Sequence, residues 1–364
     1  MKITDVQGVA LGVPLKTTGH PSSTTVAWKS KQVVVKVLSD EGIIGIGEAF
    51  SSGLPLAVCN VIEEGLKPYL VGEDPTQIER LLEKMFRETF SYARRGLALF
   101  AISGVEIALW DLVGKMNGLS VSALLGGPCE AKVRAYASLL RYERPEEVVE
   151  IASAQKEKGF TAIKLHQADL ESVRAVRKAL GDEVDLMVDV NCAWTPLEAI
   201  QKARELSDYN LLWLEEPVWP PEDYRGLAQV TAAVDVPIAA GENESTRYGF
   251  RELIAWKAVD IVQPSLCKVG GLLEGKKICH MASSWNVLPV APHANLFGAG
   301  MAATVHFVAS TPGCLFVEYP AAELVTEFLI GLPCPRGGFI EVPRKPGLGV
   351  ELDEKVTRRY PYRP

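Results

Sequence analysis

Short apolar segments recur along the chain from about residue 131 onward, and successive segments begin about 25 residues apart. Amphipathic stretches such as Leu170–Leu180 and Pro196–Leu206 separate them. Short strands that alternate with helices of roughly 10 to 15 residues indicate parallel β/α units, and eight such units match a closed barrel. A doubly wound open sheet is the alternative, but it usually has fewer strands and a glycine-rich phosphate turn, and neither GxGxxG nor GxxxxGK[ST] occurs here. The eight segments are Val133–Leu140, Ala162–Leu165, Asp185–Val190, Leu211–Leu214, Val236–Ala240, Asp260–Val262, Val287–Val290 and Cys314–Val317.

The beginning of the chain follows a different pattern and predicts a small α+β domain. Two β-branched segments, Gln32–Leu38 and Ile43–Glu48, flank a Ser-Asp-Glu-Gly turn and predict a hairpin. We therefore expect an α+β capping domain over residues 1–125, a barrel over 126–324, and a C-terminal segment, 325–364, that packs back on the first domain. Helices are expected over Pro55–Leu70, Pro75–Tyr92 and Gly96–Met116, the last of them ending at Gly118.

Charge and cysteine usage restrict the class of protein. Lys plus Arg is 38 and Asp plus Glu is 45, which gives a net charge of −7, and the absence of a basic run argues against nucleic acid as a partner. The seven Cys are scattered, odd in number and without a CxxC, as expected for reduced thiols in a cytosolic protein. No signal peptide and no uninterrupted apolar stretch of about 18 residues is recognisable. We expect a soluble, cytoplasmic protein that acts on a small molecule and not at a membrane.

Three acidic residues end three successive predicted strands. Asp189, Glu215 and Glu242 stand 26 and 27 residues apart. Because the carboxyl ends of barrel strands converge at one rim, these side chains must come close together, and they would repel one another without a cation. Oxygen ligands of this kind suit Mg²⁺, and the lack of His or Cys in the set disfavours zinc. The alternative is that each carboxylate caps a helix or pairs with a lysine. This would readily explain one such residue, but it explains less well three residues at matching positions of successive strands.

Basic residues flank this predicted metal site. Lys164 and His166 end the second strand and, two residues apart, point the same way into the barrel mouth. His293 ends the seventh strand, on the other flank of the site. A lysine or histidine near its working pKa can take a proton from carbon, so these three residues are candidate catalytic groups. His280 and His306 lie in helical stretches, and we expect structural roles for them.

Four segments carry a resemblance to a known family. In order along the chain they resemble the mandelate racemase branch of the enolase superfamily, and the resemblance covers the whole length. It implies a capping domain over a modified (β/α)7β barrel, with Mg²⁺ bound by Asp189, Glu215 and Glu242. It also implies that a base removes the proton next to a substrate carboxylate through an enediolate, with the Lys or His bases and Mg²⁺ that enolase-superfamily sites use. The segments are VEIALWDL at 105–112 with the following LLGG, KLH at 164–166, the acidic set within VDVN, LEEP and GEN, and PGLGVELD in the tail.

Further catalytic and binding roles follow from the resemblance alone. Lys164 would add positive charge to the bound carboxylate. Glu318, at the end of the eighth predicted strand, would donate or share a proton with the other oxygen of that carboxylate. Asn191 would contact the substrate or support the residues that do. Members of the branch often form even-numbered assemblies, so we expect a homo-oligomer.

Substrate specificity would come from capping-domain loops. The loops that match are Thr17–Ser30 and Ser51–Leu54, and the first of them brings His20 and Trp28 as candidate substrate contacts. Arg94 and Arg141 are candidates for contact with a second carboxylate, although ordinary surface salt bridges explain them equally well. The identity of the substrate carboxylate therefore stays open at the level of sequence.

Two positions depart from the family pattern. His166 stands where this branch often has a second lysine. Ser265 stands where racemase-like members pair an aspartate with the histidine of strand seven, and where lactonizing members place a catalytic lysine. Lys268 lies three residues further on and is assigned to a loop, so most of the case for a cycloisomerase is lost. Without the aspartate, His293 should be less basic, although Ser265 could still exchange one hydrogen bond with it.

This asymmetry favours dehydration of a hydroxylated carboxylate, such as a sugar acid, to a 2-keto-3-deoxy acid. His166 would be the base that removes the α-proton, and His293 would be the acid that protonates the departing β-hydroxyl. A racemase or epimerase, in which both histidines alternate as base and acid, is the alternative. A barrel that binds a divalent metal without catalysis is a further one.

Overall fold

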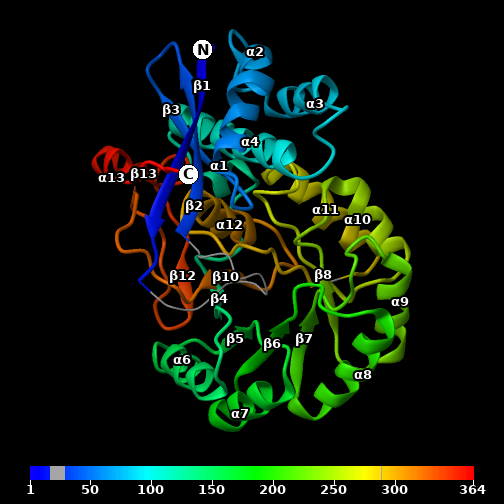
Figure 1. The fold of residues 1–364 in the computed structure, drawn as a ribbon. Helices are drawn as coiled ribbons and strands as arrows, with labels where there is room; N and C mark the ends of the chain where they lie inside the picture. Colours follow the sequence, from blue (N-terminus) through cyan, green and yellow to red (C-terminus); the bar gives the residue numbers. More distant parts are fainter. Residues whose placement is uncertain (17–28, 288) are drawn as a thin grey trace.

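An antiparallel sheet begins the chain in a computed structural model, which describes residues 1–16, 29–287 and 289–364. Its strands β1 (Ile3–Pro14), β2 (Lys29–Ser39) and β3 (Ile44–Ala49) pair in the order β1-β2-β3. Helices pack beside this sheet at the top of the molecule (Figure 1). The predicted Pro55–Leu70 helix is divided into three segments, because Pro68 cannot donate a helical hydrogen bond. The helical segments are α1 (Pro55–Asn60), η1 (Val61–Leu66), α2 (Lys67–Leu70), α3 (Ile78–Glu88) and α4 (Leu97–Asn117).

Helix α4 is the core of this capping domain. It ends at Gly118, which adopts the left-handed conformation with φ 66° as the sequence predicts. It lies directly against β3. The two backbones are so close that a Cβ atom at Gly47 would lie 2.1 Å from the Gly104 carbonyl oxygen. Among the described residues it is the one helix long and apolar enough to cross a membrane, but 83% of its most apolar stretch is buried inside the protein. The apolar sequence of α4 is therefore explained by its place in the core.

A ring of parallel strands forms the second part of the molecule (Figure 1). The strands pair in the order β10-β4-β5-β6-β7-β8-β9. Isolated parallel bridges, Val262 to Val290 and Val290 to Cys314, complete the ring. In the described part of the predicted seventh strand Val290 forms these bridges, and Pro289 has no N–H to pair. The strands are β4 (Lys132–Ser138), β5 (Ala162–Leu165), β6 (Asp185–Asp189), β7 (Leu211–Glu215), β8 (Ile238–Ala240), β9 (Ile261–Val262) and β10 (Val317–Pro320).

A helix follows each strand position of the ring except the last. Strand β10 leads directly into the C-terminal segment, so the architecture is the (β/α)7β barrel that the sequence predicts. Two short helical segments, α5 (Val121–Leu124) before β4 and η2 (Ser207–Tyr209) between α8 and β7, lie outside this alternation. The barrel helices are α6 (Pro145–Glu157), α7 (Leu170–Leu180), α8 (Pro196–Leu206), α9 (Tyr224–Ala233), α10 (Thr246–Ala255), α11 (Leu272–Ser284) and α12 (Ala299–Ala309).

Large apolar side chains close the inside of the barrel below the site. Tyr136, Trp213 and Phe316 contact one another edge to face or tilted, with ring centroids 5.8 to 6.1 Å apart. Alternate residues of a strand share one face, so the inward residue two positions after Trp213 is Glu215. In the same way, Glu318 lies two positions after Phe316 and on the same face. This layer therefore supports the charged residues from beneath and keeps water away from one side of them.

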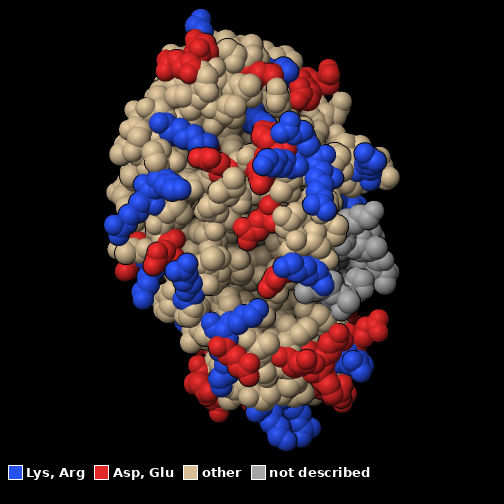
Figure 2. All heavy atoms as spheres, turned by 90° about the vertical axis from the view of Figure 1, so that its left-hand side faces the viewer, with Lys and Arg blue, Asp and Glu red and all other residues tan. Residues whose placement is uncertain are grey.

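The C-terminal segment contacts both parts of the molecule. Strand β12 (Phe339–Glu341) pairs antiparallel with β4, and β11 (Leu329–Ile330) pairs with β13 (Glu351–Leu352). After α13 (Glu354–Arg359), the Tyr360 carbonyl accepts a hydrogen bond from Gly12 of β1 at 3.0 Å. Figure 2 shows acidic and basic side chains intermixed on the face at the left of Figure 1. That face therefore presents no broad field of one sign.

Two buried carboxylates of the capping domain cap barrel helices. Glu48 of β3 accepts a hydrogen bond from the Gly300 amide at 2.8 Å, at the start of α12. Glu106 of α4 accepts hydrogen bonds from Leu272 and Leu273 at the start of α11, at 2.7 and 2.9 Å. A carboxylate at a helix N-terminus satisfies free amides and is stabilised by the helix dipole. Helices α11 and α12 follow the sixth and seventh strand positions of the ring, so the capping domain helps to fix the elements that carry Ser265 and His293.

The burial of Glu48 predicts a pH-dependent stability. Burial raises the pKa of Glu48 from 4.5 to about 7, against the hydrogen bonds from Gly300 and Gly298. Between these values the folded protein holds a proton that the unfolded chain releases, so the contribution of Glu48 to the free energy of unfolding falls as pH rises. Glu48→Gln keeps an acceptor but cannot ionise. Its stability relative to the wild type should therefore increase between about pH 4.5 and 7, by at most about 3 kcal/mol.

Denaturant unfolding of both proteins across this pH range measures the difference. Glu88→Gln, which changes an exposed carboxylate of α3 in the same way, is the matched control and should show a difference independent of pH. A constant difference for Glu48→Gln would mean that Glu48 does not titrate in this range.

Candidate active site

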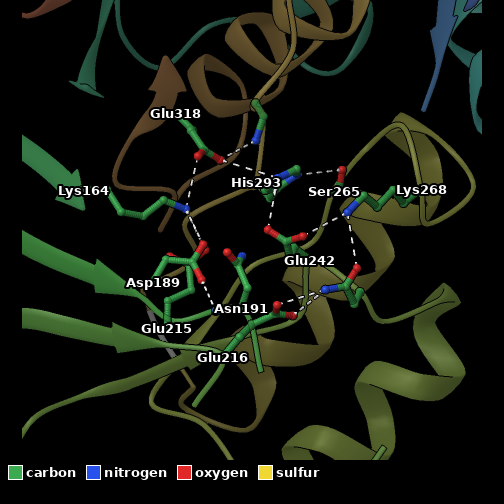
Figure 3. Close-up of polar contacts among 12 residues, drawn as sticks. Lys164, Asp189, Asn191, Glu215, Glu216, Glu242, Ser265, Lys268, His293 and Glu318 are labelled. Carbon is green, nitrogen blue, oxygen red and sulfur yellow. Dashed lines mark hydrogen bonds and ion pairs between the residues drawn. The ribbon is translucent and has the colours of Figure 1, made fainter. Parts of the chain in front are cut away.

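Three carboxylates meet at the carboxyl ends of β6, β7 and β8 (Figure 3). Asp189 and Glu215 end their strands and are fully buried, and Glu242 follows β8. One oxygen from each lies within 4.8 Å of the other two. Mg²⁺ takes six oxygen ligands and keeps several waters, so these three residues could hold one ion and leave its remaining positions to water and substrate. The donor set and its spacing fit a hard divalent cation.

Lys164 of β5 supplies the positive charge inside this cluster. Its Nζ lies 2.7 Å from Glu215 Oε1, 3.3 Å from Asp189 Oδ2 and 3.1 Å from Glu318 Oε1. Burial would lower the pKa of Lys164, but the carboxylates of Glu215 and Glu318 outweigh it and hold that pKa well above its ordinary value. Lys164 therefore stays charged, and it can attract a substrate carboxylate into the mouth.

One lysine does not balance the cluster. Burial raises the pKa of Glu215 to about 8 against the charge of Lys164, with repulsion from Asp189 adding to the shift. The pKa of Asp189 is lowered, because Lys164 and His166 outweigh the effect of its burial. Neighbouring carboxylates whose pKa values are driven apart indicate unrelieved repulsion, which a bound cation would remove.

His166 is fixed in one orientation beside Asp189. Its Nδ1 contacts the Leu139 carbonyl oxygen, which can only accept a hydrogen bond, so Nδ1 carries the proton. The other ring nitrogen, Nε2, lies 3.3 Å from Asp189 Oδ2. Nε2 therefore faces the carboxylate cluster, and Asp189 can accept a hydrogen bond from that atom when it carries a proton.

His293 has different partners on the other flank (Figure 3). Its Nδ1 lies 3.2 Å from Ser265 Oγ, and its Nε2 lies 3.1 Å from Glu242 Oε2. A carboxylate oxygen accepts, so Nε2 donates to Glu242 when it carries a proton, as Nε2 of His166 can donate to Asp189. Burial lowers the pKa of His293, although Glu242 and Glu318 act against it. The hydrogen bond that the sequence allowed between Ser265 and His293 is present.

The sequence placed Glu318 at the end of the eighth strand. In the structure it is the second residue of β10. Its Oε2 accepts a hydrogen bond from Ala294 at 2.8 Å, and its Oε1 faces Lys164. Burial would raise the pKa of Glu318, but Lys164 and His293 lower it to about 2. The group is therefore an ionised acceptor in this arrangement, and proton donation by Glu318 stays a prediction that requires a change at Lys164.

Lys268 lies in the loop between β9 and α11, as the sequence predicts, and its side chain joins the site. Its Nζ lies 3.1 Å from Glu242 Oε1 and 4.3 Å from the centroid of the Phe50 ring of the capping domain. It is 3% exposed. Lys268 thus holds one oxygen of Glu242 while His293 holds the other. The sequence signal was a lysine three residues beyond the predicted strand end, next to a Gly-Gly pair that brings the chain back towards the barrel.

The remaining predicted residues divide into three groups. Asn191 lies at the mouth beside the carboxylates (Figure 3), and its backbone N–H donates to Asp189 Oδ1 at 2.9 Å. His20 and Trp28 lie outside the described residues. His306 is buried and links Ser122 to Leu348, while His280 is exposed on α11, so both lie away from the chemistry as expected.

Comparison with known families identifies the architecture. Residues 4–126 match the model of the mandelate racemase / muconate lactonizing enzyme N-terminal domain, and residues 147–356 match the enolase C-terminal domain-like model. The chain belongs to the mandelate racemase / muconate lactonizing enzyme family of the enolase superfamily. The residues at the ends of β5 to β8 that carried the resemblance are those gathered in the site.

Similar members of this family act on sugar acids and their lactones. A D-galactarolactone cycloisomerase of Agrobacterium fabrum is 34% identical over 99% of both chains. A D-xylonate dehydratase of Haloferax volcanii is 34% identical over 88% of this chain and 83% of its own. The solved structure of a 3,6-anhydro-D-galactonate cycloisomerase from Zobellia galactanivorans superposes over 100% of both chains with a TM-score of 0.90 and 34% identity.

Proposed function

We propose that this enzyme is a Mg²⁺-dependent lyase that dehydrates a sugar acid to a 2-keto-3-deoxy acid. Lys164 attracts the substrate carboxylate, His166 removes the α-proton, and His293 protonates the β-hydroxyl as it leaves. Bound at Asp189, Glu215 and Glu242, Mg²⁺ would supply the charge that stabilises the enolised carboxylate. The D-xylonate dehydratase relative supports this assignment.

The different Nδ1 partners of the two histidines carry the proposal. His166 Nδ1 faces a carbonyl that can only accept, so Nε2 is the nitrogen that takes up the α-proton, beside Asp189. His293 Nδ1 faces the Ser265 hydroxyl, and the protonated ring, which lies beside Glu242 and Glu318, can give up a proton to the leaving hydroxyl. We therefore assign the base to His166 and the acid to His293, which is the division of labour that elimination of water needs.

Unpaired acceptors near the strand ends support a polyhydroxylated substrate. Gln167 Oε1, Asn191 Oδ1 and Asn295 Oδ1 are buried and have no hydrogen-bond partner within the described chain. They stand one or two residues after His166, Asp189 and His293. A buried acceptor without a partner is costly, and a sugar hydroxyl would satisfy that of Asn191, which lies beside the carboxylates (Figure 3).

Proton NMR in D₂O with Mg²⁺ tests the proposal on a panel of sugar acids. Loss of the α-proton signal with formation of a 2-keto-3-deoxy product supports it and names the substrate. Deuterium incorporation with inversion and without loss of water would replace the lyase by a racemase. No exchange with any sugar acid would contradict both.

The alternative of cycloisomerisation is favoured by the full-length match to D-galactarolactone cycloisomerase. The same base and acid serve it, because only the leaving oxygen differs. If the β-oxygen belongs to a ring, it stays in the molecule, and the product is an isomer of the substrate. Mass spectrometry of the product distinguishes the two reactions, since dehydration lowers the mass by one water and ring opening leaves it unchanged.

Replacement of Ser265 tests the role of His293. Ser265→Asp places a carboxylate beside Nδ1 and should raise the pKa of His293 by about 1 to 2 units. An acid with a higher pKa stays protonated to higher pH, so the alkaline limb of the kcat profile should move up by a similar amount. Ser284→Asp on α11 is the matched control and should leave the profile unchanged. Movement of the acidic limb instead would show that His293 acts as a base, as a racemase requires.

A further inference from the structure

Arg141 lies at the mouth of the barrel without an acidic partner. It follows β4, and the carbonyl of Leu139, two residues earlier, holds His166. Its Nε and one terminal nitrogen are buried and have no hydrogen-bond partner in the described part of the chain. The sequence allowed a surface salt bridge for this residue, and the described residues form none with it. Arg94, the other candidate, is exposed.

A buried guanidinium is ordinarily saturated, as Arg177 shows. Its nitrogens donate to the carbonyl oxygens of Tyr209, Gly181, Val184 and Asn210 at 2.6 to 3.0 Å. Arg141 has no comparable set among residues 1–16, 29–287 and 289–364, and its burial lowers its pKa while Asp189 and Asp169 act against that shift. An arginine remains charged in proteins, so an unpaired cation is held at the rim. Such an arrangement is costly to folding and indicates a partner that arrives with the substrate.

Neither nearby acid is free to neutralise Arg141. Asp189 belongs to the carboxylate cluster and lies beside Lys164 and His166. Asp169 caps α7 through the amide of Ser172 at 2.7 Å. The first carboxylate of a substrate is directed to Lys164 and the metal cluster, so Arg141 is available to a different anionic group.

We propose that Arg141 binds the distal carboxylate of a substrate with a carboxylate at each end, which makes the substrate an aldaric acid or its lactone. This inference rests on the proposed function, because it presumes a sugar acid in the mouth. A guanidinium binds a carboxylate through two parallel hydrogen bonds, and two of its buried nitrogens are unpaired here. One guanidinium also matches the single charge of a carboxylate better than the larger charge of a phosphate.

Steady-state kinetics and binding on matched substrates test the inference. The panel pairs each aldarate with the aldonate of the same configuration and with its 6-phosphate. The wild type should favour the aldarate, and Arg141→Met should lower kcat/KM for the aldarate by about 10- to 100-fold while changing that for the aldonate less than about 3-fold. Arg94→Met is the matched control and should change neither. Because Arg141 has no partner to lose, its variant should keep or raise the thermal midpoint.

The outcomes separate this inference from the proposed function. Dehydration of aldonates and aldarates alike, with Arg141→Met slowing both equally, would overturn the inference and leave the function intact. A preference for the 6-phosphates that Arg141→Met removes would also overturn it. Calorimetry with the Mg²⁺-loaded enzyme tests whether the inference can hold when the proposed function fails. If aldarates bind more tightly than aldonates, this difference depends on Arg141, and no α-proton exchange occurs, the inference is supported and the lyase is rejected.

Discussion

Replacing Glu215 with glutamine is expected to abolish turnover and to weaken Mg²⁺ binding. Glu215 is the middle carboxylate of the cluster, is fully buried, and receives a hydrogen bond from Trp213 Nε1 at 2.8 Å that fixes its orientation. Glutamine preserves shape and this acceptor but removes the negative charge. Loss of a preorganised electrostatic contribution in a closed site costs about 10²- to 10³-fold in kcat, and loss of a metal ligand adds to it. We therefore expect kcat to fall by more than about 10³-fold.

Metal binding gives a second measurement that does not depend on activity. A ligand that binds only the folded protein raises its unfolding temperature, so Mg²⁺ should stabilise the wild type and have little effect on Glu215→Gln. Without Mg²⁺ the variant should be at least as stable as the wild type, because one charge of a repelling set is removed. Glu205→Gln, an exposed change on α8, is the matched control. Full activity in Glu215→Gln would reject the metal assignment.

Replacing His293 with asparagine is expected to separate the two halves of the reaction. Asparagine cannot protonate the departing hydroxyl, so dehydration should fall by about 10²- to 10⁴-fold. His166 and Lys164 remain, and exchange of the substrate α-proton with D₂O should continue within about tenfold of the wild-type rate. Parallel NMR measurements of exchange and product formation give both rates from one sample.

The matched control is His280→Asn, which makes the same change at an exposed position of α11. Loss of exchange with retention of dehydration would reverse the roles of His166 and His293. Equal loss of both would mean that the two histidines act together in removing the α-proton, as in a racemase.

The two histidines differ in the partner of Nδ1, although Nε2 of each faces a carboxylate. His166 Nδ1 faces a backbone carbonyl, and His293 Nδ1 faces the hydroxyl of Ser265. The hydrogen-bond partner of each ring, and not the ring itself, decides which nitrogen carries the proton. The aromatic layer below keeps the charged groups in a poorly solvated space, where such differences have large effects.

The sequence by itself determined the barrel and its three carboxylates. The alternation of short strands and helices defines parallel units, and in a closed barrel every strand ends at the same rim. Asp189, Glu215 and Glu242 could therefore be brought together without knowledge of any distance. Lys164 and His166 followed from the two-residue period of a strand, and the observed positions agree with that reasoning.

Prediction from the sequence fails where the position of a residue depends on contacts with other segments of the chain. Among the described residues of the predicted seventh strand only Val290 forms a bridge, and Glu318 lies within β10. Lys268 lies in a loop as predicted, but nothing in its immediate sequence indicated that its side chain contacts Phe50 and Glu242. Side-chain reach across a barrel mouth depends on the packing of both domains.

Only the tertiary structure decided which groups find a partner. Glu48 reaches Gly300 across 252 residues of chain, and Glu106 reaches Leu272 across 166. The proton positions of His166 and His293 and the unpaired state of Arg141 likewise depend on atoms contributed by other strands. Periodicity in a sequence encodes which face of an element is buried. Hydrogen bonds and ion pairs between distant elements require that those elements be placed within about 3 Å of one another, which packing alone achieves.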